Sequence, residues 1–302
     1  MTIKNGMLNI SAYPIIEVCG SDDEERPTVL ILEDLKIEAS RGVQINNDGY
    51  VHIEVNNIEI QTNSYHGWCL QVSGSTNSNR YVEVLVNGSD LLSTQGYVIE
   101  CNGDAEVSIK NAKLGGAAGI LMQAGSLTME NTALVTENNS TNPSIPTNAI
   151  AFTPATNAVH VILTLGPGNQ ISSKSGAIFH IVPAAQGGVT AQIAITGGTF
   201  IAENGHPLFS ALERIEKVVE ISGGSFPGIS PEESAALAPC LSESITIDED
   251  GNVAAKPQEP GVIVIHPNEE NQTQSNPGTG APINAIGQWL WSIVCWMHSQ
   301  VR

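Results

Sequence analysis

Positive charge and aromatic side chains are both scarce in this sequence. Its 302 residues include only 12 Lys and Arg against 31 Asp and Glu, so the formal net charge is −19, and aromatic residues make up 5%. So acidic a surface repels a phosphate backbone, which argues against nucleic acid as a partner. It also disfavours acidic polysaccharides unless divalent cations bridge them. With few aromatics available, the core must be built from Val, Ile, Leu and Ala.

Cysteine pairs and metal-ligand clusters are lacking as well. The chain has five cysteines, an odd number, and no C-x-x-C spacing, so no redox compartment follows from them. Cys69 and Cys101 occupy apolar positions of expected strands, and we expect both to be buried free thiols. The histidines are spread singly and form neither a metal set nor a Ser-His-Asp arrangement. No cofactor and no metal are expected.

The most regular feature is a frame that reads apolar, x, apolar, x, Asn, x, x, apolar. It occurs in residues 107–114 and 127–134. The first three positions alternate like a strand with one buried face, and Asn at the bend tolerates a left-handed backbone. Further copies, with Asn, Asp or Gly at the bend, are residues 1–8, 30–37, 53–60, 84–91, 193–200 and 219–226, and residues 163–171 form a degenerate copy around Pro167.

A second strand signature follows each frame, and in several repeats a glycine opens it, as at Gly42, Gly67, Gly96 and Gly119. Two strand signatures in each repeat of roughly 20 to 36 residues indicate a solenoid. Because the period varies while the bend stays in register, the sequence predicts an all-β fold, a right-handed parallel β-helix of about nine coils. Asn111 and Asn131 either only supply the turn or also form an internal ladder of hydrogen bonds between coils.

The pattern changes beyond residue 226. Ser230-Pro-Glu-Glu is a capping box that predicts a short helix to about Leu237, and residues 245–253 around an Asp-Gly turn predict a small hairpin. Helix and hairpin together would cap the last coil. The expected organisation is a parallel β-helix at 1–226, a C-terminal cap at 227–255, a linker at 256–275 and a disordered tail at 276–302.

The tail contains a five-residue motif followed by an apolar stretch and a final Arg302: Asn276, Pro277, Gly278, Thr279 and Gly280. This arrangement resembles the sorting signal of Gram-positive cell-wall proteins, in the Asn-Pro-x-Thr-Gly form common in surface proteins of gut Firmicutes. The resemblance implies that a sortase cuts between Thr279 and Gly280 and joins Thr279 to peptidoglycan. The protein is then extracellular and attached to the cell wall. The alternative is a Trp-rich interfacial segment.

Two glycine-rich stretches resemble the same family. Residues 195–200, Ile-Thr-Gly-Gly-Thr-Phe, and 221–226, Ile-Ser-Gly-Gly-Ser-Phe, look like units common in cell-wall-anchored parallel β-helix (pectin-lyase-like fold) surface proteins. That family implies an adhesin-like role. The chain shows no export signal and already reads as a repeat at residue 1, so we expect an upstream portion to be missing from it.

An enzyme has to be considered, because the same scaffold carries pectate lyases and polygalacturonases. A glycosidase needs two or three carboxylates on one groove. The acidic strand residues are scattered and are interpreted as solvated, outward-facing groups: Glu54, Glu83, Glu100, Glu106 and Glu130. The Asn-Thr-Asp and Gly-His-Gly signatures of polygalacturonases are absent. We therefore expect no catalytic residues.

Aromatic side chains gather only in coils two to four: Tyr50, Tyr65, Trp68, Tyr81 and Tyr97. Exposed on a flat sheet they would stack on sugar rings, whereas buried they would only pack. The sequence predicts a non-catalytic, monomeric bacterial surface protein, adhesin-like or in contact with host or dietary glycans, with sortase and peptidoglycan as partners. Two alternatives stay open: a polysaccharide-active lyase or glycosidase, and a structural spacer for a missing N-terminal domain.

Overall fold

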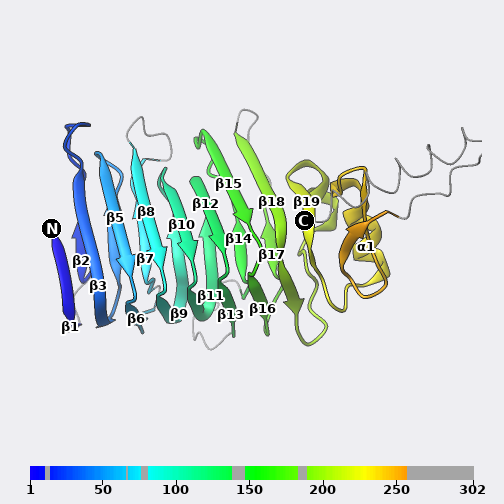
Figure 1. Ribbon diagram of the computed structural model, residues 1–302, viewed down its shortest axis with the longest axis horizontal. Helices are drawn as coiled ribbons and strands as arrows, with labels where there is room; N and C mark the ends of the chain where they lie inside the picture. Colours follow the sequence, from blue (N-terminus) through cyan, green and yellow to red (C-terminus); the bar gives the residue numbers. More distant parts are fainter. Residues whose placement is uncertain (11–13, 66, 76–80, 138–146, 183–188, 257–302) are drawn as a thin grey trace, which may run out of the picture. The chain divides into compact units, whose positions relative to one another are not determined.

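The computed structural model describes residues 1–10, 14–65, 67–75, 81–137, 147–182 and 189–256 (Figure 1). Met1–Pro257 forms one compact unit. The expected linker and the motif from Asn276 to Gly280 lie outside the described residues, so the expectations for them remain predictions.

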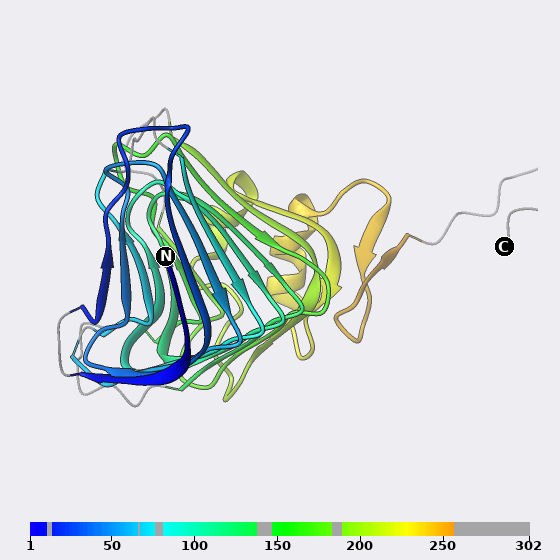
Figure 2. The same cartoon turned by 60° about the vertical axis from the view of Figure 1, so that its left-hand side comes forward.

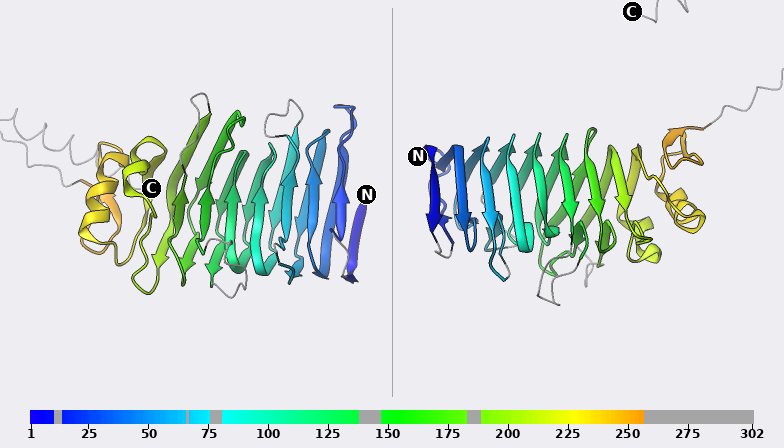
Figure 3. Two further views of the ribbon diagram at one scale, coloured as in Figure 1. Left: turned by 180° about the vertical axis from the view of Figure 1, so that it is seen from behind. Right: turned by 90° about the horizontal axis from the view of Figure 1, so that it is seen from below.

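Strands make up 57% of the structure and helices 7%. The strands lie side by side in three rows, which Figure 3 shows from two further sides. The first row holds β1 (Thr2–Ile10), β3 (Thr28–Ala39), β5 (Val51–Asn56), β8 (Val82–Asn87), β10 (Glu106–Lys110), β12 (Gly125–Glu130), β15 (His160–Leu165), β18 (Thr190–Ala202) and β19 (Val219–Ser225).

The other two rows follow the bends. The second row joins the later parts of β3 and β18 through β6 (Glu59–Thr62), β9 (Asp90–Cys101), β11 (Lys113–Met122), β13 (Ala133–Thr136) and β16 (Gln170–Ser173). The third row contains the ends of β9 and β11 together with β2 (Ile16–Val18), β4 (Val43–Asn46), β7 (Leu70–Ser73), β14 (Ile150–Phe152) and β17 (Phe179–Ile181). The rows surround a common interior (Figure 2).

The predicted fold class, an open right-handed β-helix solenoid of about nine coils, is wrong. The hydrogen-bonded pairings return to their start: from β3 they run through β5, β8, β10, β12 and β15 to β18, and back through β16, β13, β11, β9 and β6 to β3. These twelve strands form a closed, all-parallel β-barrel. The ring closes because β3 and β18 are long enough to pass through the bend and pair in two rows.

The repeat frame nevertheless predicted which residues pair. Ile53 lies opposite Val84, Val84 opposite Val107, and Val107 opposite Leu127, so the first apolar position of each frame stacks on the same position of the next. These side chains are at most 4% exposed. Because successive side chains of a strand point to opposite faces, keeping the register keeps the first apolar position of each of these frames in the core.

The bend residues adopt the left-handed backbone that the frame predicted, with φ of 52° at Asp34, 53° at Asn57, 54° at Asn111 and 48° at Asn131. In the last three repeats the positive φ falls one residue later than expected, at Gly168, Gly198 and Gly224. At the degenerate repeat the reason is plain, since the ring of Pro167 fixes φ near about −65° and only the next residue can make the bend.

Asn111 and Asn131 also form a ladder. The Nδ2 of Asn131 donates to Oδ1 of Asn111 at 2.5 Å, and the Nδ2 of Asn111 donates to Oδ1 of Asn87 at 2.9 Å. All three side chains are exposed, so the ladder lies on the outside of the molecule and not in its interior, as one interpretation of the sequence had it. Each asparagine therefore both makes the turn and connects neighbouring strands.

Substitution of Asn111 separates these two roles. Asn111→Ala is expected to lower the free energy of unfolding by about 1–2 kcal/mol, since alanine tolerates the left-handed backbone at φ 54° less well than asparagine does. Asn111→Gly keeps the backbone conformation and loses only exposed hydrogen bonds, so its effect should be smaller. Urea denaturation measures both. Equal losses in the two variants would contradict the backbone explanation.

Glycines open the third-row strands because a neighbouring carbonyl group occupies the place of a side chain. A Cβ added to Gly42 would lie 2.1 Å from the carbonyl oxygen of Cys69, and one added to Gly96 would lie 2.1 Å from that of Gly67. Gly119 faces Ala149 at the same distance. The glycine signature seen in the sequence therefore reflects the close approach of successive strands, not a need for positive φ.

The core is mainly aliphatic and becomes aromatic near the C-terminal end. Phe179 stacks on Phe209 with ring centroids 4.8 Å apart, and Phe200 stacks on Phe226 at 5.3 Å. The buried free thiols expected at Cys69 and Cys101 are confirmed, and burial raises the pKa of both to about 12.

The helix and hairpin expected after the last frame are confirmed. α1 (Pro231–Leu237) begins with the capping box, in which the Ser230 and Glu233 side chains each accept the other's backbone N–H. Glu233 also accepts the backbone N–H of Leu208 at 2.6 Å, which connects α1 to the segment between β18 and η1. η1 (Leu212–Lys217) and η2 (Ala238–Cys240) flank α1, and β20 (Ile245–Ile247) pairs antiparallel with β21 (Val253–Ala255).

Candidate functional site

The outer face of β5, β8 and β10 carries a column of ionisable side chains. His52 lies opposite Glu83, and Glu83 lies opposite Glu106, at register positions where residues point away from the core. The expectation that the acidic strand residues are scattered is wrong for these glutamates. Their common signal was available in the sequence, since Glu83 and Glu106 each directly precede the first apolar residue of a frame.

His52 joins two of the carboxylates. Its Nδ1 lies 2.7 Å from Oε2 of Glu83, and its Nε2 lies 3.2 Å from Oε1 of Glu54. Partial burial acts to lower the pKa of His52, but the hydrogen bonds and charges of Glu54 and Glu83 outweigh it, so the pKa is raised above its usual 6.5. The imidazole is the only cationic group that contacts these two glutamates within the described residues.

Tyr81 completes this cluster, which we call the His52 surface: His52, Glu54, Tyr81, Glu83 and Glu106. The Tyr81 residue is 48% exposed, and its hydroxyl donates to Oε2 of Glu106 at 3.1 Å. Partial burial and the carboxylates of Glu106 and Glu83 raise the pKa of Tyr81 to about 12, so the phenol stays protonated and remains a donor. The hydrogen bond holds an exposed ring beside the carboxylates of Glu83 and Glu106.

The His52 surface continues into a hollow of about 330 Å³ on the same face. Its lining includes Glu54 from β5, Asn87 from β8 and Lys110 from β10. Glu130 lies on this face too, where its carboxylate pairs with Lys110 at 3.0 Å. Glu100 does not belong to it: its carboxylate lies on the third row and accepts from Gln71 at 2.6 Å.

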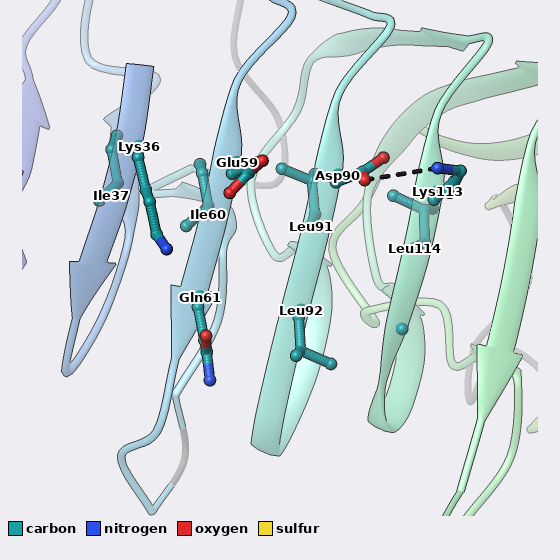
Figure 4. Close-up of a pocket in the computed structure, with 11 residues that line it drawn as sticks. Lys36, Ile37, Glu59, Ile60, Gln61, Asp90, Leu91, Leu92, Lys113 and Leu114 are labelled. Carbon is teal, nitrogen blue, oxygen red and sulfur yellow. Dashed lines mark ion pairs between the residues drawn. The ribbon is translucent and has the colours of Figure 1, made fainter. Parts of the chain in front are cut away.

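A larger groove of about 420 Å³ lies on the second row (Figure 4). Four consecutive strands, β3, β6, β9 and β11, contribute one outward residue each at paired positions: Lys36, Glu59, Asp90 and Lys113. Beside them a second set of paired positions contains Gln61, Leu92 and Gly115. We call this feature the second-row groove. Nothing in the sequence analysis singled it out.

The predicted glycan-contacting aromatics divide into separate places. Tyr81 belongs to the His52 surface, and Tyr50 precedes the neighbouring strand and is half-buried. Tyr65 is 51% exposed in the turn after β6. Trp68 and Tyr97 are only 1% and 7% exposed, so they pack in the structure and offer no sugar platform.

Trp68 and Tyr97 have structural partners instead. The guanidinium of Arg41 lies 5.9 Å from the Trp68 ring centroid, within the range of a cation–π contact. Tyr97 packs with Ala118 and Ala151. The packing interpretation left open by the sequence therefore holds for these two residues.

His160 and His180 each contact a different partner. His160 lies 3.6 Å from Asp104, and Nδ1 of His180 lies 3.0 Å from the hydroxyl of Ser210. Within the described ranges, no three His, Cys, Asp or Glu residues are arranged to hold a metal ion. Over the same ranges, no helix has the length and apolarity needed to span a bilayer.

Comparison with known proteins gives no relative. No protein-family model, no curated protein and no solved structure matches this chain.

The proton on His52 should make stability depend on pH. The pKa of His52 in the folded protein is raised above 6.5. The stabilisation that protonated His52 provides is therefore fully present below pH 6.5 and is lost as the pH rises through the pKa of the folded state. We expect the stability difference between the wild type and His52→Gln to shrink from pH 6 to pH 9, measured by urea denaturation at each pH. Glu83→Gln removes the carboxylate at 2.7 Å and should reduce this pH dependence. A constant difference across that range would contradict the arrangement.

Proposed function

We propose that this chain is a non-catalytic, glycan-contacting protein of a bacterial cell surface, and that the His52 surface makes the contact. The observation that carries the proposal is the exposed Tyr81 ring, held by its hydrogen bond to Glu106 on a rigid sheet. Sugar rings have apolar C–H faces that stack on an aromatic ring, and hydroxyl edges that hydrogen-bond to carboxylates and imidazole. The His52 surface offers both kinds of group side by side.

Retention of the full-length protein on immobilised plant and mucin polysaccharides tests this proposal. Tyr81→Ala should weaken retention on the bound polymer by about tenfold, which corresponds to roughly 1.4 kcal/mol. Tyr81→Phe keeps the ring and should retain most of the affinity. Tyr65→Ala is the matched control, because Tyr65 is similarly exposed but lies in a turn outside the His52 surface.

Failure of retention on every polymer, or equal retention by the wild type and Tyr81→Ala, would contradict the contact. Absence of both retention and cleavage would leave a structural spacer as the best remaining account.

A second candidate, polysaccharide cleavage, is favoured by one specific observation. Glu83 and Glu106 are direct partners on neighbouring strands, whose backbones are about 4.8 Å apart. Retaining glycosidases place their two carboxyl groups roughly 5–5.5 Å apart. Against this candidate, Glu83 and Glu106 stand on an outward sheet face, where both side chains are open to water in the described part of the chain.

An assay for new reducing or unsaturated ends separates binding from cleavage. If the chain is an enzyme, Glu83→Gln and Glu106→Gln should each abolish product formation. Glu130→Gln, on the same face but paired with Lys110, should not. Product formation by the wild type would replace the non-catalytic proposal, whereas retention without product would support it.

The attachment to peptidoglycan is a proposal supported by the resemblance of the tail to a sorting signal. Incubation of the full chain with a sortase that accepts Asn-Pro-x-Thr-Gly and with an amine nucleophile should yield a product ending at Thr279. Mass spectrometry identifies the cut, and Thr279→Ala should block it. An intact chain under conditions that cleave a control peptide would contradict the proposed anchor.

A further inference from the structure

The residues of the second-row groove have no role in the functions proposed above. Its outward residues on four strands are charged or amide side chains, and Leu92, 41% exposed, is the one large exposed apolar side chain among its lining residues, because the isoleucines and other leucines of the lining are buried in the core. Beside Leu92, Gly115 leaves open space: a Cβ there would meet only the Leu92 side chain at 3.5 Å and the Val135 carbonyl oxygen at 3.9 Å. Grooves of roughly 300–1,000 Å³ are the usual size for small-ligand sites.

The charges of the groove are already largely matched. The Nζ of Lys36 lies 3.1 Å from Glu38, and that of Lys113 lies 3.5 Å from Asp90 (Figure 4 draws the second pair). Glu59, between these pairs, has no ion-pair partner among the described residues. An incoming anion would have to displace a carboxylate from a lysine and would also meet Glu59.

We infer that the second-row groove binds a neutral oligosaccharide, with an apolar ring face on Leu92 over Gly115 and with hydroxyl groups hydrogen-bonded to Glu59, Gln61 and the two lysines. The inference shares its ligand class with the proposed function but uses a different row of strands. It also names the glycan class, because the paired lysines and the net charge of −19 disfavour uronic acid polymers.

A purely apolar ligand fits the groove less well. It would remove water from the Glu59 carboxylate, which has no ion-pair partner among the described residues, without offering a hydrogen bond in return, and burying an unpaired charge is costly. Sugar hydroxyls, which both donate and accept, satisfy carboxylate, amide and ammonium groups alike. The mixture of side chains therefore selects a ligand with a polar edge and an apolar face.

Calorimetric titration of the full-length protein with a hexamer of β-1,4-linked glucose and with a hexamer of galacturonic acid tests the inference. We expect the neutral hexamer to bind at least about tenfold more tightly than the acidic one. Gly115→Leu fills the open space and should weaken the neutral hexamer by about tenfold, whereas Gly115→Ala fits the space and should weaken it much less. Gln61→Ala provides a second variant that leaves the backbone unchanged, in case Gly115→Leu fails to fold.

The outcomes separate this site from the His52 surface. Binding lost in Gly115→Leu and Gln61→Ala but kept in Tyr81→Ala supports the groove. Binding lost only in Tyr81→Ala overturns the groove and supports the His52 surface. Absence of binding to the neutral hexamer, or equal affinity for the acidic one, also overturns the inference.

Discussion

Phe200→Ala is expected to lower the free energy of unfolding by about 3–5 kcal/mol, the range for removing a large buried aromatic side chain. Phe200 is fully buried, its ring stacks on Phe226 with centroids 5.3 Å apart, and it lies 5.8 Å from the ring of Phe179. Phe179 and Phe226 are themselves fully buried, so the ring is surrounded by packed side chains. We therefore expect the neighbouring side chains to relax only partly into the cavity that the substitution leaves.

Ile201→Ala is the matched control for this substitution. Ile201 is the next residue of the same strand, points outward and is 39% exposed, so its truncation should change stability by no more than about 0.5 kcal/mol. Urea denaturation of the two variants beside the wild type gives the comparison. Similar small losses in both would contradict the aromatic core described for the C-terminal repeats.

Gly96→Ala is expected to destabilise the protein by about 1–3 kcal/mol, the usual cost of forcing extra atoms into a packed interior. The added Cβ would lie 2.1 Å from the carbonyl oxygen of Gly67, well inside any allowed contact, and the neighbour is backbone. The strands would have to separate where the chain enters its third row. For a unit of this size each kcal/mol lowers Tm by roughly 2–4 °C, so a thermal scan detects the change.

Gly115→Ala tests whether the effect of Gly96→Ala comes from the close approach of the backbones. Gly115 also lies in a long strand that pairs on both sides, but the added Cβ has ordinary contacts there. Its Tm should remain close to that of the wild type. An equal drop in both variants would mean that loss of glycine itself, and not the approach of the Gly67 carbonyl, determines the result.

The local order of this fold could be predicted from the sequence because parallel strands stack equivalent positions. The frame fixed the pairing of Ile53, Val84 and Val107, and the preference of Asn for a left-handed backbone fixed the bends at Asn57 and Asn111. The later bends moved by one residue, since with two adjacent glycines, as at Gly197 and Gly198, either residue can take positive φ.

The closed ring of strands could not be predicted in this way. It depends on β3 and β18 continuing without a break through the bend, so that each pairs in two rows. No residue type marks this continuity, because Asp34 in β3 occupies the same bend position as the asparagines of the interrupted repeats. An open solenoid and a closed ring have the same frame.

Part of the candidate site could have been predicted from the sequence. Alignment of the frames would have placed Glu83 beside Glu106, because a parallel register carries equivalent positions onto one face. The burial of Trp68 was not evident, since an aromatic residue between a turn and a short strand can point to either side. The second-row groove could not be predicted, because it depends on which residues of neighbouring strands pair. Gly115, which has no side chain, lies opposite the exposed Leu92.

The central proposal is that this chain contacts glycans through the His52 surface without cleaving them. The most direct measurement is the binding of the labelled full-length protein to an array of neutral and acidic plant and mucin glycans, beside Tyr81→Ala and Tyr65→Ala. The account predicts binding to a restricted set of glycans that Tyr81→Ala loses and Tyr65→Ala retains, with every glycan recovered intact. Binding to no glycan, or identical binding by Tyr81→Ala and the wild type, would contradict it.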